Sequence, residues 1–326
     1  MTERSAWRRD DMDNTFYDII CDAAGNGAVK RDALLKRYTT FRIGGPADIL
    51  VSVSSPEALL RVMTEITGRS VPYCIIGRGS NLVFDDAGFR GVVVRICESQ
   101  GDEALKIVSS DAGSAVIYGF AGCTLSAAST FAMENELSGL EFASGIPGSI
   151  GGGVVMNAGA YGGELSQCVI KSTYLKLDGD VPEEGTLEGE EQGFAYRDSA
   201  YQRNGLIVTG AYFKLKKGTD RETIASKMRE LNGRRREKQP LELPSAGSAF
   251  KRPKNDFAGR LIEASGLRGF RIGGAQVSEK HCGFIVNRGG ATAEDVRALV
   301  KAVRERVFDN TGVVLEPEIK FVKERN

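Results

Sequence analysis

Three polar residues stand in apolar or glycine-rich surroundings and could carry chemistry: Arg197, Ser248 and Glu318. An arginine can bind a carboxylate through two parallel hydrogen bonds, a serine hydroxyl can donate a proton, and a protonated carboxylic acid can stabilise a developing anion. Each also has a simpler interpretation, because Arg197 could pair with Asp198, Ser248 could cap a turn, and Glu318 could be an exposed strand residue. These residue types alone leave the chemistry open.

The only histidine, His281, restricts the remaining chemistry. A single histidine excludes HExxH metal sites, and any Ser-His-Asp or Cys-His arrangement would have to use it. Because GFIV after it is typical of a strand, we expect Cys282 on the opposite face and the histidine at the surface or a strand edge. The six cysteines are far apart and contain no CxxC pair, so we expect small buried hydrophobic residues and no metal site.

Two glycine-rich stretches need an explanation in a chain with 40 glycines. The loop Gly77-Arg78-Gly79-Ser80-Asn81-Leu82 lies between predicted strands and matches neither GxGxxG nor GxxxxGK[ST], so it would hold a phosphate through backbone N–H groups rather than a helix N-terminus. The second stretch has nine glycines between Gly139 and Gly163. It predicts backbone close to a flat or extended ligand, and the alternative is a connection packed against a sheet.

Composition excludes several classes of protein. Lys plus Arg equals Asp plus Glu at 43 each, so the overall charge favours neither nucleic acid nor an anionic membrane surface. No apolar run is long enough to span a membrane, and the charged N-terminus lacks the apolar stretch of a secretory signal. We expect a cytoplasmic monomer that acts on small molecules.

The predicted elements alternate between strands and helices. A strand before Ser55-Pro56-Glu57 and a helix ending at Gly68 form a βα unit, because these residues supply a cap, a first-turn proline and a first-turn acid. Residues 1–37 are expected to hold a helix or two, and the basic run 234–238 to be a solvated helix end. Further strands are predicted at 73–76, 82–84, 91–96, 169–215, 281–287 and 313–322, with helices at 124–137, 219–239, 256–264 and 292–308.

Six motifs in one order carry a resemblance to a known family. They are TTFRIGGPAD, GRGSNLVF, GIPGSIGGGVVMNAGAYGGE, YRDSAY, LPSAGSAFKRP and LEPEIKFV, which span about residues 38 to 322. The chain resembles UDP-N-acetylenolpyruvoylglucosamine reductase, the flavoenzyme that makes UDP-N-acetylmuramate for bacterial peptidoglycan. The resemblance implies an α+β fold with an N-terminal extension (1–37), a two-lobed FAD-binding domain of the vanillyl-alcohol-oxidase type (38–215), and a smaller α+β substrate-binding domain (216–326).

The same resemblance assigns the cofactor site. The loop 77–82 and the segment 145–153 would hold FAD. The residues implied in the segment are Gly145, Ile146, Pro147, Gly148, Ser149, Gly151 and Gly152, with Asn157, Gly159 and Ala160 close to the flavin. Because the only histidine lies in the second predicted domain, we predict noncovalent FAD, with NADPH as hydride donor.

The implied reaction has two halves, in which NADPH reduces FAD and hydride then passes to the enolpyruvyl group of the sugar nucleotide. Arg197 and Glu318 would stabilise the enolate-like charge, and Ser248 would protonate the adjacent carbon. Lys251 or Arg252 would make the setting cationic or bind the UDP phosphates. With only fifty positions between Arg197 and Ser248, the chain resembles the shorter, type II branch of the family.

Two alternatives remain open on the sequence. A flavin oxidase of the same fold would act on another alcohol or sugar and would not need all three residues together. An inactive sugar-nucleotide-binding protein would retain the fold without bound flavin.

Overall fold

The computed structural model describes residues 14–25, 28–99, 103–179 and 181–322. The chain forms two compact units. The first contains the described residues up to Asp32 together with Asp48–Arg78 and Arg90–Asn232, and the second contains Ala33–Ala47, Gly79–Phe89 and the described residues from Gly233 onward. Two short N-terminal segments therefore fold with C-terminal residues. The division at residues 37 and 215 that the sequence suggests stays a prediction.

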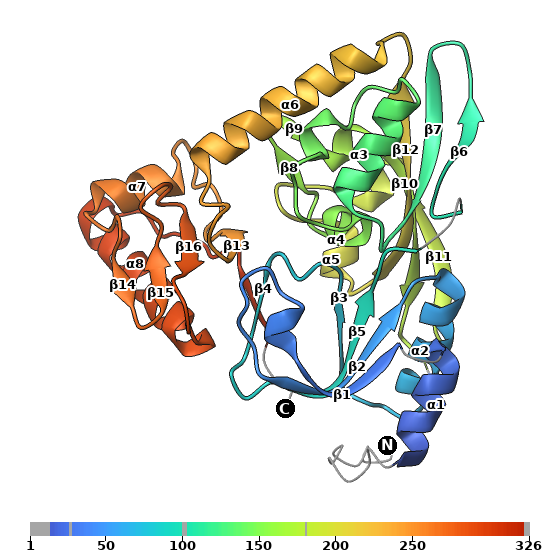
Figure 1. Cartoon of the computed structure of the whole chain (residues 1–326), viewed down its shortest axis with the longest axis horizontal. Helices are drawn as coiled ribbons and strands as arrows, with labels where there is room; N and C mark the ends of the chain where they lie inside the picture. The colour runs from blue at the N-terminus through green and yellow to red at the C-terminus, as the bar shows by residue number, and fades with distance from the viewer. Residues whose placement is uncertain (1–13, 26–27, 100–102, 180, 323–326) are drawn as a thin grey trace. The chain divides into compact units, whose positions relative to one another are not determined.

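A four-stranded sheet and two helices form the N-terminal part of the first unit (Figure 1). The sheet has the order β1 (Val29–Leu34), β2 (Pro46–Val53), β5 (Phe89–Ile96), β3 (Tyr73–Ile76), and the helices are α1 (Asn14–Ala24) and α2 (Pro56–Gly68). Helix α2 begins as predicted, because the Ser55 hydroxyl accepts a hydrogen bond from the amide of Ala58. Its apolar face, which includes Leu59 and Met63, is fully buried, so the predicted βα unit is confirmed.

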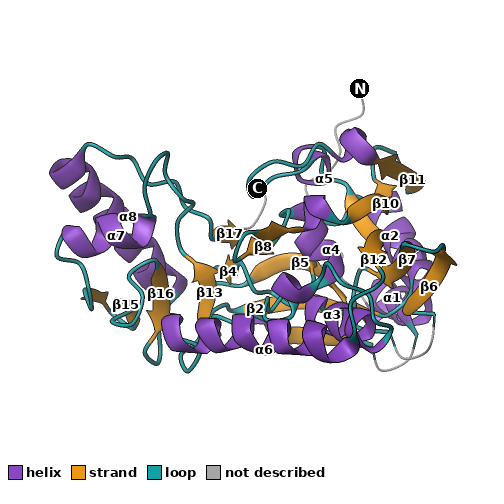
Figure 2. Ribbon diagram, turned by 90° about the horizontal axis from the view of Figure 1, so that it is seen from above, coloured by secondary structure: helices purple, strands orange, loops and turns teal. Residues whose placement is uncertain are grey.

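A five-stranded antiparallel sheet forms the rest of the first unit. Its order is β11 (Glu183–Glu188), β10 (Val169–Lys176), β12 (Ile207–Lys216), β7 (Ser114–Phe120), β6 (Leu105–Ser110). The helices α3 (Leu125–Glu134) and α4 (Ile150–Val155) lie beside β12 (Figure 2), followed along the chain by α5 (Ala200–Arg203). The short elements are the hairpin β8 (Gly159–Ala160) and β9 (Gly163–Glu164) and the 3-10 helices Glu141–Ala143, Leu165–Gln167 and Gly189–Gln192.

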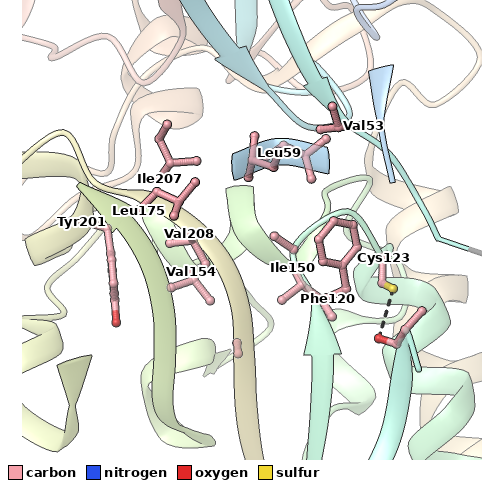
Figure 3. Packing of buried hydrophobic residues seen from close by; sticks show 14 of the residues in the cluster. Val53, Leu59, Phe120, Cys123, Ile150, Val154, Leu175, Tyr201, Ile207 and Val208 are labelled. Carbon is pink, nitrogen blue, oxygen red and sulfur yellow. Dashed lines mark hydrogen bonds between the residues drawn. The ribbon is translucent and has the colours of Figure 1, made fainter. Parts of the chain in front are cut away.

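Helix α4 is anchored by two of its three large apolar side chains. Ile150 and Val154 are completely buried in the cluster that Figure 3 shows together with Phe120 of β7 and Val208 of β12. In the same cluster the Cys123 thiol donates a hydrogen bond to the carbonyl of Ala104. Burial of this kind stabilises by roughly 1.5–3 kcal/mol per large side chain, which fixes a helix that its glycines would otherwise disfavour.

The second unit is built on a mixed set of short strands and two helices. One sheet has the order β13 (Ser245–Ser248), β16 (Phe284–Asn287), β15 (Ala275–Val277), β14 (Arg271–Ile272), and β4 (Leu82–Phe84) pairs in parallel with β17 (Lys320–Val322). The helices are α7 (Ala258–Ala264) and α8 (Ala293–Thr311), and a 3-10 helix covers Leu35–Arg37. Thr292 and Asp295 form a capping box on α8, whose apolar face is buried as predicted. Helix α6 (Arg221–Lys238) belongs to the first unit up to Asn232 and to the second from Gly233 onward, and its buried residues are Ile224 and Leu231.

Several sequence predictions are wrong in detail. Within residues 1–37 the expected helix is present as α1, but the strand β1 follows it; residues 1–13 and 26–27 lie outside the described part. The predicted strand 313–322 is reduced to its last three residues, because Pro317 cannot donate a ladder hydrogen bond and forms only an isolated bridge with Phe250. His281 lies before β16 in a turn that the Ser278 hydroxyl closes by accepting from the amide of His281.

Candidate active site

The two glycine-rich segments meet within the first unit at Gly77 and Ser149. A Cβ on Gly77 would lie 2.2 Å from the Ser149 hydroxyl oxygen, so a larger residue would displace this hydroxyl from its capping position. Ser149 is 2% exposed and caps α4 by accepting from the amide of Gly152 at 3.3 Å. The structure therefore brings together two segments that the sequence assigns to the same cofactor. The second segment was expected to hold the cofactor as a loop, and this is wrong in part because it contains the short helix α4.

The glycines of the second segment divide into two groups. A Cβ on Gly151 would lie 2.9 Å from the Ala121 methyl group, and one on Gly153 would lie 3.0 Å from Leu165, so protein packing explains both. At Gly148 the nearest atom would be 3.6 Å away, and at exposed Gly152 only the Ser149 hydroxyl comes within 4 Å. Gly148, Gly152 and exposed Pro147 thus leave backbone accessible, which fits a flat cofactor lying over this segment.

The remainder of the first loop lies in the second unit. Gly79 has a left-handed φ of 62°, and a Cβ there would lie 2.3 Å from the carbonyl oxygen of Tyr38. Among the residues that the structure describes, none accepts a hydrogen bond from the amide of Gly79 or Ser80. Free amides in a glycine-containing turn can bind an anion, so this loop fits the predicted phosphate contact through backbone groups.

Arg197 occupies the tip of a tight turn in the first unit. Ala195 and Asp198 close the turn through two backbone hydrogen bonds of 3.0 and 3.2 Å. Arg197 has φ of 56°, and such a left-handed backbone costs a non-glycine residue roughly 1–2 kcal/mol, so the surrounding structure must offset this strain. The guanidinium donates to the carbonyl of Gly159 at 3.1 Å and lies 5.1 Å from the ring centre of Tyr196.

The carboxylate next to Arg197 is bound by other residues. Asp198 accepts hydrogen bonds from Arg203 and from the side-chain amide of Gln202 at 2.9 Å. Burial alone would raise the pKa of Asp198, but these hydrogen bonds outweigh it and lower the pKa. Asp198 therefore stays ionised and forms an ion pair with Arg203.

Ser248 and Glu318 come close together within the second unit through backbone pairing. The amide of Glu318 donates to the carbonyl of Ala249 at 2.9 Å, and the amide of Lys251 donates to the carbonyl of Glu316 at 2.9 Å. The segment 316–318 thus runs beside 249–251, next to exposed Ser248 at the end of β13. The side-chain amide of Asn81 donates to the carbonyl of Glu318 at 3.1 Å, which ties the first loop to this segment.

The two basic residues after Ser248 also have partners. The ammonium group of Lys251 forms an ion pair with the carboxylate of Glu316. The guanidinium of Arg252 lies 4.5 Å from the ring centre of Phe257. An exposed ion pair of this kind contributes only about 0–1 kcal/mol, so a phosphate could replace Glu316 at small cost.

His281 and the cysteines take no part in these arrangements. The ring nitrogen Nδ1 of His281 accepts from the amide of Gly283 at 3.0 Å, and burial lowers the pKa of this histidine. All six cysteines are free; Cys123, Cys168 and Cys282 are buried as expected, while Cys21, Cys74 and Cys97 are only partly buried. Burial raises the pKa of Cys168 to about 12. Among the described residues, no group of three or more His, Cys, Asp or Glu side chains could hold a metal ion.

One residue that supports the site escaped the sequence analysis. Ser199 is completely buried, caps α5, and donates through its hydroxyl to the carbonyl of Val155 at 2.7 Å. The pattern Ser-x-x-Gln from Ser199 to Gln202 is a capping signal that could have revealed it.

Comparison with known proteins decides the family. A family model for the C-terminal domain of UDP-N-acetylenolpyruvoylglucosamine reductase matches residues 239–322, and one for an FAD-binding domain matches residues 47–183. Curated reductases of this name from Lachnoclostridium phytofermentans and Agathobacter rectalis are each 44% identical over 96% of this chain, covering 99% and 100% of their own lengths. The chain belongs to the UDP-N-acetylenolpyruvoylglucosamine reductase family.

The fold of this reductase family is confirmed by a solved structure. The crystal structure of the reductase from Thermus caldophilus is 37% identical and matches with a TM-score of 0.74 over 90% of this chain and 99% of its own. The predicted family, the α+β fold with an FAD-binding domain, and the predicted class of FAD-dependent oxidoreductase are thereby confirmed. Within the described ranges, no helix has the length and apolar character needed to cross a membrane.

Proposed function

We propose that this chain reduces UDP-N-acetylglucosamine enolpyruvate to UDP-N-acetylmuramate with NADPH, a step in peptidoglycan precursor synthesis. The family match over both the FAD-binding and the C-terminal domain carries this proposal. FAD bound here would supply the hydride-transfer chemistry between NADPH and the enolpyruvyl group. The accessible backbone of Gly148 and Gly152 and the amides of Gly79 and Ser80 are the groups we assign to holding it without a covalent bond.

Arg197 is assigned to the substrate carboxylate. Hydride addition to the enolpyruvyl group places negative charge on the adjacent carbon and its carboxylate, and a fixed guanidinium lowers the energy of that charge as it develops. The strained turn and the hydrogen bond to Gly159 hold the guanidinium before the reaction, so little reorganisation is needed.

Ser248 is assigned as the acid that protonates the carbon next to the carboxylate. Its exposed position at the end of β13 leaves the hydroxyl accessible. A serine hydroxyl is a weak acid, so the transfer needs nearby positive charge and exclusion of water. Lys251 and Arg252 are the nearest basic residues in the sequence, and we assign them to this charge and to the UDP phosphates.

Glu318 is assigned to the same developing charge. A carboxylic acid assists an enolate-like anion only in its protonated form, in which it donates a hydrogen bond. The backbone bond from Glu318 to Ala249 and the bond from the Asn81 side-chain amide to the Glu318 carbonyl support this position beside the Ser248 segment. Ser248 and Glu318 would then act from two neighbouring segments of the second unit.

We also propose that the chain is a cytoplasmic monomer that binds small molecules rather than nucleic acid. Equal numbers of basic and acidic residues provide no net positive charge for a phosphate backbone. The only histidine, His281, lies in the second unit with Nδ1 accepting from Gly283, which supports noncovalent flavin.

The test is spectroscopic and kinetic. The purified protein, supplied with FAD, should show visible flavin absorbance. When the protein is precipitated with acid, the flavin should stay in solution, whereas covalently attached flavin would precipitate with the protein. NADPH consumption under anaerobic conditions should then depend on UDP-N-acetylglucosamine enolpyruvate. An oxidase would instead turn over an alcohol with oxygen, and an inactive binding protein would retain no flavin; either result would refute the proposed reaction.

A further inference from the structure

The end of α4, the residues that follow it and the turn that carries Arg197 are joined by side-chain hydrogen bonds. The Asn157 amide nitrogen donates to the carbonyl of Ala195 at 3.1 Å, and the Ser199 hydroxyl donates to the carbonyl of Val155 at 2.7 Å. These two bonds hold both ends of the turn 195–199. The Arg197 guanidinium, bonded to Gly159, completes a third connection between the same two segments.

Asn157 has little capacity left for a ligand. Its side chain is 1% exposed, and its carbonyl oxygen accepts from the amide of Ser166 at 3.0 Å while its nitrogen donates to Ala195. A side chain with this burial and both polar ends engaged cannot offer a large surface to a flavin. Its backbone has φ of 42°, a conformation that asparagine tolerates better than most residues, so the residue type fits this place in the chain.

Ser199 is equally enclosed. It is completely buried, and its hydroxyl oxygen accepts a hydrogen bond from the amide of Gln202 at 3.3 Å. The hydroxyl hydrogen is donated to the carbonyl of Val155. Arg197 lies between these two supports in a left-handed conformation that a free turn would rarely adopt. The turn is thus held in a strained form from both sides.

We propose that Asn157 and Ser199 are positioning residues that clamp the 195–199 turn and hold the Arg197 guanidinium in its working direction. The inference rests on the proposed role of Arg197 in the second half of the reaction. It gives Asn157 a task different from the flavin contact that its motif suggests. Neither residue touches the reacting atoms, and each acts through the arginine.

The first measurement needs no catalysis. Amide hydrogen exchange of residues 195–199 in the purified protein should become faster in Asn157→Asp, which lacks the donor to Ala195, and in Ser199→Ala. Ser166→Ala is the matched control, because it keeps the backbone amide that Asn157 accepts from and does not touch the turn. Unchanged exchange in both clamp variants would overturn the proposal. If one of the two variants does not fold, the other still tests it.

The second measurement is a double-mutant cycle. Oxidation of the reduced enzyme by the sugar nucleotide should slow about tenfold to a hundredfold in each clamp variant, since small displacements of a catalytic group have effects of that size. FAD affinity and reduction by NADPH should stay within about threefold of wild type. In an Arg197→Lys background, Asn157→Asp should add less than about threefold, because residues that act as a unit are not additive.

The outcomes separate the clamp from the reaction. Loss of FAD affinity in Asn157→Asp with unchanged reoxidation of the bound flavin would make Asn157 a cofactor contact and overturn the proposal. A full effect in the Arg197→Lys background would also overturn it. Wild-type reoxidation in Arg197→Lys alone would instead contradict the proposed function of Arg197, while the exchange measurement would still test the clamp.

Discussion

The two units hold the residues that we propose for the reaction in different ways. In the first, main-chain bonds close the turn that carries Arg197, but the side chains of Asn157 and Ser199 attach its ends to the rest of the unit. In the second, Ser248 and Glu318 depend mainly on main-chain pairing between 249–251 and 316–318. Main-chain hydrogen bonds survive most substitutions, whereas a side-chain clamp can be removed by one. The arginine should therefore be sensitive to changes in residues around it, and the serine and glutamate mainly to changes in themselves.

The largest effect is expected at Ser248 itself. Ser248→Ala should slow reoxidation by the sugar nucleotide about 10²- to 10⁴-fold, the range typical of a lost general acid, and leave flavin reduction by NADPH unchanged. Ser245→Ala, on the same strand, is the control. Stopped-flow absorbance resolves the two halves; equal slowing of both would remove Ser248 from the role of acid.

Arg197→Lys should come next, with reoxidation about 10²- to 10³-fold slower, since a lysine keeps the charge but not the two-pronged hydrogen bonding to a carboxylate. The control is Arg203→Lys, which changes the arginine that pairs with Asp198. If the two substitutions had the same effect in single-turnover measurements, charge in this region rather than the position of Arg197 would matter.

A smaller effect is expected from Asn81→Ala in the second unit. Its side chain supplies one hydrogen bond to the Glu318 carbonyl, and losing a bond worth about 1 kcal/mol should slow reoxidation roughly fivefold. The main-chain bond from Glu318 to Ala249 would remain. An effect as large as that of Asn157→Asp would break the contrast between main-chain and side-chain support. Asn135→Ala, at the end of α3, is the control.

The smallest effect concerns pH and the second unit alone. Burial lowers the pKa of His281 from its ordinary 6.5, and nearby Arg268 lowers it further while Glu263 opposes the shift. The unfolded chain then binds a proton that the folded one does not, so the free energy of unfolding should fall as the pH drops below 6.5 and level off below the folded pKa. Denaturant unfolding of His281→Asn should lack this part of the pH dependence. An identical pH dependence in the variant would show that other groups cause it.

The sequence predicts those features that local chemistry determines. Helix α2 follows from Ser55 and Pro56, and α8 from its capping box and apolar spacing. Gly77 of one glycine-rich segment does meet Ser149 of the other, while their common role in holding the cofactor stays a prediction. These features depend on residues close together in the chain or on sequence motifs that occur in few kinds of structure.

Other features depend on contacts between distant residues and could not be predicted. Helix α4 contains three consecutive glycines, and forms because Ser149 caps it and Ile150 and Val154 are buried. The pairing of 249–251 with 316–318 joins segments far apart in the chain, and the left-handed backbone of Arg197 leaves no trace in its residue type. The assignment of Arg197, Ser248 and Glu318 to one reaction stays a prediction.

The central claim is that this chain passes hydride from NADPH to an enolpyruvyl sugar nucleotide through FAD. An anaerobic single turnover tests it most directly: one equivalent of NADPH should bleach the flavin absorbance, and one equivalent of UDP-N-acetylglucosamine enolpyruvate should restore it while UDP-N-acetylmuramate forms in equal amount. Recovery that requires oxygen and proceeds without the sugar nucleotide would contradict the account.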